Sequence, residues 1–147
     1  MYVKEVMTAS VNYVAPDATV PDVARLMRDE DIGSVPVAEH DRLIGMITDR
    51  DLVVRLLADG LEMSAVRARD VMSPRILYCV EDQSVDDVLN NMADNQVRRL
   101  PVINRQKRLV GMVSLGDLSR AADRRAGSAL RQITQPEAAP FSRYGPT

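Results

Sequence analysis

Residues 42–52 read RLIGMITDRDL, and residues 108–118 read RLVGMVSLGDL. Six of these eleven positions are identical, and the differing positions include conservative exchanges such as Thr for Ser and Ile for Val. The likeness extends upstream, because residues 3–38 match residues 68–103 at 11 of 36 positions. The chain is therefore a duplication, and both copies must adopt the same structural unit.

Each copy predicts the same elements in the order β-α-β-β-α. Residues rich in β-branched and aromatic side chains predict strands near 11–14 and 76–80. Apolar residues at helical spacing predict helices over about 20–30 and 85–95. A second helix ends each copy, after two further short strands at 35–38, 43–48, 100–103 and 109–114. The predicted fold class is α+β, with both helices of a copy covering one face of a three-stranded sheet.

The repeats also define the expected domain organisation. Residues 3–58 form the first repeat, residues 59–67 a linker and residues 68–122 the second repeat. Residues 123–147 are expected to extend the last helix and then become irregular, since prolines and a glycine follow in the tail. One repeat is too small to bury enough apolar surface for a stable fold of its own. We therefore expect two repeats packed sheet against sheet with pseudo-twofold symmetry in one module.

Composition excludes several classes of protein. Apolar residues make up 46% of the 147 residues and charged residues 27%, which is typical of a globular protein. No apolar run is long enough to cross a bilayer, so we expect no membrane partner. A net charge of −2 and only five aromatic residues argue against nucleic acid as a partner. A single cysteine and the lack of a signal-peptide pattern favour a cytoplasmic protein.

The repeated motif reads Gly-x-apolar-Thr/Ser-x-x-Asp at residues 45–51 and 111–117. It places a hydroxyl and a carboxylate three residues apart where a strand enters a helix. One interpretation is a capping box, in which Thr48 or Ser114 caps the helix. Another is a ligand site, in which free backbone N–H groups and the hydroxyl hold a phosphate and the carboxylate accepts hydrogen bonds from sugar hydroxyls. The two interpretations are compatible.

The order, spacing and repetition of these motifs resemble a tandem pair of cystathionine β-synthase (CBS) domains, also called a Bateman module. The resemblance rests on the VMT and VMS openings, the SVPV and RLPV strands and the repeated motif. It covers residues 3–122 and is strongest to the stand-alone CBS-pair proteins of bacteria. It implies two clefts between the repeats that bind adenosine-containing ligands such as AMP, ADP, ATP or S-adenosylmethionine.

The resemblance also implies which residues line these clefts. Asp51 and Asp117 would hold the ribose, while Thr48 and Ser114 would lie near phosphate or ribose. Residues before each Pro-Val strand, at the start of each first strand and within the motifs would complete the clefts, with adenine bound by backbone and apolar contacts. These further residues are Ile32, Gly33, Ser34, Met46, Val97, Arg98, Arg99, Met112, Thr8, Asn12, Ser73 and Leu77.

The two repeats differ at one matched pair of positions. Repeat two has Arg98 and Arg99 where repeat one has Gly33 and Ser34. Two guanidinium groups beside Ser114 predict a phosphate site, unless the arginines face solvent or pair with a nearby aspartate. The cleft of repeat one lacks this positive charge, so weaker binding, a nucleoside ligand and an empty cleft all stay open for it.

These features predict a regulatory module that binds an adenine nucleotide and signals by a change of conformation or assembly. The alternative is an oligomerisation or protein-interaction module with vestigial clefts. No catalytic residue, metal site or required cofactor is expected, because the sequence offers no acid–base pair, metal-ligand cluster or activated nucleophile. His40 is expected in a solvated turn and Cys79 in a buried strand. Expected partners are the nucleotide, a second copy in a homodimer and an unidentified protein target.

Overall fold

The computed structural model describes residues 1–121 and 130–134. Most of the predicted tail at 123–147 lies outside the described residues, while 130–134 are helical. The chain divides into two compact units, each assembled from separate stretches of sequence. Unit 1 contains Met1–Val11, Leu77–Gln106 and the chain from Val110 onward, and unit 2 contains Asn12–Ile76 and Lys107–Leu109.

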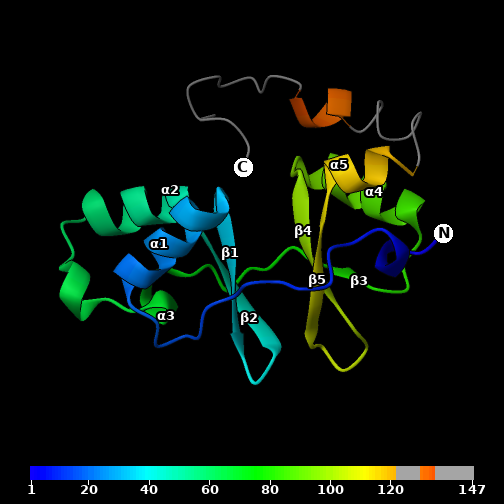
Figure 1. Cartoon of the computed structure of the whole chain (residues 1–147). Coiled ribbons are helices and arrows are strands. Elements are labelled where there is room, and N and C mark those ends of the chain that lie inside the picture. The colour runs from blue at the N-terminus through cyan, green and yellow to red at the C-terminus, as the bar shows by residue number, and fades with distance from the viewer. Residues whose placement is uncertain (122–129, 135–147) are drawn as a thin grey trace. The chain divides into compact units, whose positions relative to one another are not determined.

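Unit 2 is built around an antiparallel hairpin (Figure 1). At the tip of the hairpin, His40 and Asp41 have positive φ of 53° and 65°, the left-handed conformation of a tight two-residue turn. Its elements in chain order are α1 (Val20–Glu30), β1 (Ser34–Glu39), β2 (Arg42–Thr48), α2 (Asp49–Asp51), the π-helix η2 (Leu52–Leu57), the 3-10 helix η3 (Met63–Ala65) and α3 (Ala68–Val71).

Unit 1 contains a three-stranded sheet in the order β3-β4-β5, with β3 parallel to β4 (Figure 1). The N-terminal turn lies beside β3, where Val3 N–H donates to the Gln83 carbonyl at 2.9 Å. Its elements are the 3-10 helix η1 (Val3–Glu5), β3 (Cys79–Val80), α4 (Val85–Asn95), β4 (Arg99–Ile103), β5 (Leu109–Ser114) and α5 (Leu115–Ser119).

The two long helices begin where the sequence predicts. Thr19 Oγ1 accepts from Asp22 N–H at 3.2 Å, and Ser84 Oγ accepts from Asp87 N–H at 3.1 Å. Both side chains cap a helix N-terminus, where backbone N–H groups lack partners within the helix. The predicted helices at 20–30 and 85–95 are thereby confirmed. No helix in the described part of the chain is long and apolar enough to span a membrane.

The predicted first strand of each repeat is shorter than expected. Residues 11–14 contribute one parallel bridge, from Val14 to Val37, and residues 76–80 contribute only the two-residue β3. Val14 N–H donates to the Pro36 carbonyl, so the next donor toward the N-terminus would be Pro36 itself. Proline has no N–H, and this stops the parallel ladder. Pro101 stands in the same place beside β3.

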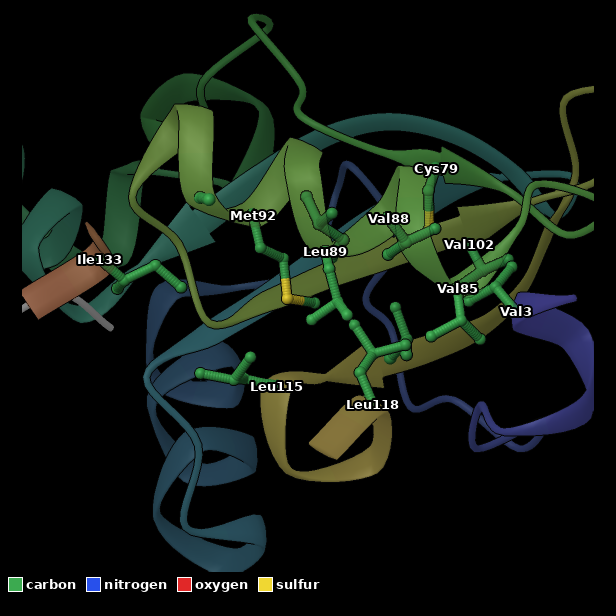
Figure 2. Packing of buried hydrophobic residues seen from close by; sticks show 13 residues of the cluster. Val3, Cys79, Val85, Val88, Leu89, Met92, Val102, Leu115, Leu118 and Ile133 are labelled. Atoms are coloured by element: carbon green, nitrogen blue, oxygen red, sulfur yellow. The ribbon is translucent and has the colours of Figure 1, made fainter. Parts of the chain in front are cut away.

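Each unit has its own apolar core. In unit 1, Leu89 and Met92 of α4 point toward the Leu115 and Leu118 side chains of α5, and Ile133 joins them (Figure 2). All five side chains are at most 8% exposed. In unit 2 the apolar residues of α1 pack on the hairpin in the same way. The side chains of this core with 0% exposure come from α1, the hairpin and α3, and they are Val23, Val35, Val37, Ile47, Ala68 and Val71.

The opening segment of each repeat packs in the unit that contains the other repeat's motif. Thr8 N–H donates to the Met112 carbonyl and Met112 N–H donates to the Thr8 carbonyl, both at 2.9 Å. Ser73 and Met46 exchange the same pair of bonds, at 2.8 and 3.2 Å. The repeats are therefore continuous in sequence, while each compact unit contains pieces of both.

Candidate functional site

The repeated motif forms a capping box in both units. Ser114 Oγ accepts from Asp117 N–H at 3.0 Å, and Asp117 Oδ2 accepts from Ser114 N–H at 2.9 Å. Thr48 and Asp51 make the matching bonds at 3.1 and 2.8 Å. The strand leaves the sheet at the hydroxyl residue because these two bonds replace sheet pairing with helix capping. The capping interpretation is confirmed, and it uses one oxygen of each carboxylate.

We define the unit 1 site as Ser114, Asp117, Arg98 and Arg99, and the unit 2 site as Thr48, Asp51, Gly33 and Ser34. The side chains of Ser114, Asp117, Thr48 and Asp51 are partly buried, while both arginines are exposed. Each set lies within one unit.

The backbone N–H groups after the motif hydroxyl are largely occupied, which corrects the expectation that they are free. In unit 1, Leu115 N–H donates to the Arg98 carbonyl at 2.8 Å, and Asp117 N–H is used by the capping box. The bond to Leu115 places the Arg98 backbone beside Ser114. Gly116 N–H is left as the amide of this turn with no acceptor among the described residues.

In the unit 2 site the corresponding turn is fully used. Asp49 N–H donates to the Gly33 carbonyl at 2.9 Å, Arg50 N–H donates to Asp49 Oδ1 at 2.8 Å, and Asp51 N–H is used by the capping box. The Asp49 carboxylate therefore accepts a hydrogen bond from Arg50 N–H, the amide that corresponds to Gly116 N–H in unit 1. Its negative charge lies next to the positive charge of Arg50 in the same turn. Leu115, at the matched position, carries no charge.

The second carboxylate oxygen of each motif aspartate faces an arginine that the sequence reasoning missed. Arg120 Nη2 lies 2.8 Å from Asp117 Oδ1; the Asp117 side chain is 17% exposed and that of Arg120 is 74% exposed. Arg55 Nε is 4.0 Å from Asp51 Oδ1, and Arg55 Nη1 donates to the Met72 carbonyl at 3.3 Å. The spacing of three and four residues along a helix was a signal that could have found both pairs.

Arg98 and Arg99 form no ion pair with any described residue, and both are exposed. One predicted competitor, Asp82, is instead held by Arg105, whose Nε donates to Asp82 Oδ2 at 2.9 Å. This hydrogen bond lowers the pKa of Asp82 below its ordinary value. Within residues 1–121 and 130–134, the two guanidinium groups of the unit 1 site are therefore not held by a carboxylate.

The remaining predicted residues divide between the units. Thr8, Leu77, Val97 and Met112 belong to unit 1, with Thr8 bonded to Met112 next to the repeat-two motif. Those of unit 2 are Asn12, Ile32, Ser73 and Met46.

Within unit 2, Ser34 pairs directly opposite Thr48 across the hairpin. The amide of Asn12 donates to Glu30 Oε1 at 2.8 Å, which ties this side chain to the end of α1. Ile32 and Val97 are partly buried and packed against the two cores. The structure therefore brings together the hydroxyl, carboxylate and pre-strand residues of each motif, and it places Thr8 and Ser73 with the motif of the opposite repeat.

Cys79 and His40 take the positions expected of structural residues. Cys79 is 1% exposed, and burial raises the pKa of its thiol to about 12, so it stays a protonated thiol at neutral pH. His40 is exposed at the hairpin turn. Among residues 1–121 and 130–134, no group of three or more His, Cys, Asp and Glu side chains could hold a metal ion.

The family model for the CBS domain matches the chain twice, over residues 3–58 and 68–124. These two matches show that the chain belongs to the CBS domain family and is a CBS pair. The chain is 39% identical over 134 residues to the CBS domain-containing protein YhcV of Bacillus subtilis, covering 90% of this chain and 94% of YhcV.

Hypoxic response protein 1 of Mycobacterium tuberculosis is 40% identical over 118 residues, covering 80% of this chain and 82% of that protein. A crystal structure of Hypoxic Response Protein I with two coordinated zinc ions superposes with a TM-score of 0.74, covering 82% of this chain and 98% of that one. The crystal structure of CBSX2 in complex with AMP has the same fold, with a TM-score of 0.71 at 24% identity, and covers 84% and 96% of the two chains.

Proposed function

We propose that the unit 1 site binds the ribose and phosphate of an adenine nucleotide. The observation that carries this proposal is a pair of exposed arginines, Arg98 and Arg99, that have no ion-pair partner among the described residues. They lie in the segment bonded to the residue after Ser114. Guanidinium groups match phosphate geometry and charge. Asp117 Oδ1 lies outside the capping box, so it can accept hydrogen bonds from ribose hydroxyls once its arginine contact is shared or broken.

We infer that the unit 2 site takes a phosphate less well. Gly33 and Ser34 bring no positive charge, and the Asp49 carboxylate occupies the backbone N–H that Gly116 leaves open in unit 1. Asp51 still offers an oxygen outside its capping box. A nucleoside without phosphate therefore suits this site better than a nucleotide.

The proposed role is regulatory, with ligand binding read out through a change of conformation or assembly. CBSX2 is seen with AMP, but at 24% identity that likeness shows the fold alone. Support for the nucleotide proposal therefore comes from the side chains of this chain. We propose no catalytic role and no further cofactor, and we place the protein in the cytoplasm because its single, buried cysteine suits a reducing compartment.

A second candidate function, protein association, is favoured by one specific observation. Unit 2 exposes a run of apolar side chains on η2 and just after it. Exposed apolar patches of this kind are typical of surfaces that bind another protein, because binding removes them from water. The side chains of this run are Val53, Val54, Leu57, Leu61 and Met63, which are 44–75% exposed. We propose that this surface, the η2 surface, contacts a second copy of the chain in a homodimer.

The nucleotide proposal is tested by isothermal titration calorimetry of AMP with Asp117→Ala. Hydrogen bonds to a charged group contribute about 1.5–3 kcal/mol, so affinity at the unit 1 site should fall about ten- to a hundredfold. Asp87→Ala is the matched control, because Asp87 holds the same third position of a helix in unit 1 without belonging to the site. Unchanged AMP affinity in Asp117→Ala, with wild-type binding intact, would remove Asp117 from the proposed site.

A further inference from the structure

We propose that Arg120 competes with ribose for Asp117 and so biases the unit 1 site toward ligands that carry a phosphate. This inference rests on the proposed function of that site and adds a residue that sets its selectivity. Arg120 lies at the end of α5, three residues after Asp117, on the same face of the helix.

The competition follows from how the oxygens of Asp117 are used. Oδ2 accepts from Ser114 N–H, and Oδ1 accepts from Arg120 Nη2 at 2.8 Å. A ribose that donates two hydroxyls to this carboxylate must therefore share Oδ1 with the guanidinium or displace it. Because the Arg120 side chain is 74% exposed, displacement returns it to water and disturbs no buried group. Displacement nevertheless breaks a charge-assisted hydrogen bond.

The loss is compensated only when the ligand brings its own negative charge. Adenosine is neutral, so the displaced guanidinium gains no new partner from it. AMP adds a phosphate near the same carboxylate, and a long, exposed arginine side chain can turn from carboxylate to phosphate without moving the backbone. Arg120 thus penalises adenosine and leaves AMP with little or no penalty, in addition to the direct attraction of Arg98 and Arg99.

The unit 2 site lacks this arrangement. Arg55 approaches Asp51 Oδ1 only to 4.0 Å, and another nitrogen of its guanidinium donates to the Met72 carbonyl. Arg55 is thereby bonded to the backbone of the segment that opens repeat two. Asp51 Oδ1 is therefore more weakly held by its arginine than Asp117 Oδ1 is. The two sites consequently differ in selectivity through the arginine beside each carboxylate as well as through the residues before each strand.

The test is a pair of calorimetric titrations, adenosine and AMP, on Arg120→Met. Methionine keeps an unbranched apolar stem and removes every N–H donor. All proteins carry Asp51→Ala, so that the unit 1 site titrates alone. An exposed ion pair of this kind is worth little, so adenosine should bind about two- to fivefold more tightly in the variant. AMP affinity should stay the same or fall, so the AMP preference over adenosine narrows.

Salt gives a second readout that a merely structural arginine would not move. Raising NaCl from about 50 mM to about 500 mM screens the Arg120–Asp117 pair, so adenosine should bind more tightly at high salt with Arg120 present. With Arg120→Met, adenosine affinity should not depend on salt. Arg105→Met is the control, because it breaks the exposed Arg105–Asp82 pair elsewhere in unit 1 and should change neither ligand.

The outcomes separate this inference from the proposed function. If AMP binds and Asp117→Ala weakens that binding as expected, but Arg120→Met leaves adenosine affinity unchanged or lower, Arg120 does not compete and only the inference fails. If neither adenosine nor AMP binds the protein with Arg120 in place, the proposed function fails together with it. Tighter adenosine binding that is confined to Arg120→Met, with Arg105→Met unchanged, supports both.

Discussion

At the scale of single residues, the motif glycines are required by the segments that pack against them. A Cβ added at Gly111 would lie 2.6 Å from Met7 Sδ and 2.8 Å from the Thr8 carbonyl oxygen. The atoms nearest to a Cβ added at Gly45 belong to the Met72 side chain, with its sulfur at 2.5 Å. A methionine side chain can move aside, whereas a carbonyl that is held in a backbone bridge cannot. Gly111 is therefore the stricter of the two.

We predict that Gly111→Ala destabilises the protein by about 1–3 kcal/mol, the usual range for overpacking. Gly116→Ala is the control, since its added Cβ would meet nothing closer than Ser114 Oγ at 3.6 Å. In an exposed helix turn, alanine is better than glycine by up to about 1 kcal/mol. Urea denaturation should therefore order the proteins Gly111→Ala, wild type, Gly116→Ala. Equal stability of wild type and Gly111→Ala would show that the Thr8 backbone shifts to make room for the added methyl group at little cost.

Exchange of the two arginines tests the charge difference between the repeats. Changing Arg98 to Gly and Arg99 to Ser gives unit 1 the residues of the unit 2 site. We predict that AMP binds about five- to a hundredfold more weakly, since contacts between arginine and phosphate contribute about 1–3 kcal/mol. Adenosine affinity should change little. Titrations of both ligands at two salt concentrations check this, and equal losses for both would mean that the arginines only support the fold.

Residue-scale features of the site were only partly predictable. The hydroxyl and carboxylate spacing predicts the capping box correctly, because capping depends on residues close in sequence. The matched positions of the two repeats revealed the exchange of Gly33 and Ser34 for Arg98 and Arg99, and the family resemblance implied that this segment lies near the motif. The roles of Asp49 and Arg120 were missed, since they depend on which oxygen or amide is still unoccupied after the cap has formed.

At the scale of elements, the repeat pattern predicted the helices and hairpins well and the first strands poorly. Apolar spacing depends on burial of one helix face, and both 11-residue helices bury that face. The first strands are short because the parallel ladder ends at Pro36 and Pro101 on the neighbouring strand. The strand propensity of a segment does not take into account which residues it will pair with. The internal repeat also does not predict whether an opening segment packs against the motif of its own repeat or that of the other repeat, because the two motifs are similar in sequence.

We predict that removal of residues 1–11 destabilises unit 1 and leaves unit 2 folded. The deletion removes Val3, which is fully buried, and both backbone bonds to Met112. In hydrogen exchange, the Met112 amide should therefore lose protection while the Met46 amide in unit 2 keeps it. A control with exposed Lys4 and Ser10 changed to Ala should behave as wild type. If the Met112 amide stayed protected in the shortened chain, residues 1–11 would not be needed to stabilise the repeat-two motif, and the prediction would be wrong.

At the scale of the whole molecule, the main prediction concerns assembly through the η2 surface. We predict that the purified protein sediments as a dimer of about twice 16.3 kDa at micromolar concentration. Leu57 is 75% exposed, and Leu57→Glu places a charge on the η2 surface that a dimer would have to bury. This variant should sediment as a monomer, as should Val53→Glu.

Tyr78→Gln is the control for the assembly experiment, because Tyr78 is an apolar residue of unit 1 with a comparable exposure of 47%. It should leave the dimer intact. A wild-type protein that sediments as a 16 kDa monomer, with and without nucleotide, would reject the homodimer. Loss of the dimer in Tyr78→Gln as well would show that association does not depend on the η2 surface.

The crossed opening segments have an evolutionary consequence. After most gene duplications, the two daughter copies can diverge, be lost or be recombined into new chains independently. Here the half that ends before the second repeat carries Met7 and Thr8, against which Gly111 of the other half must remain a glycine. Met72 restricts Gly45 in return. Each half therefore limits which substitutions the other half can accept at its motif glycine.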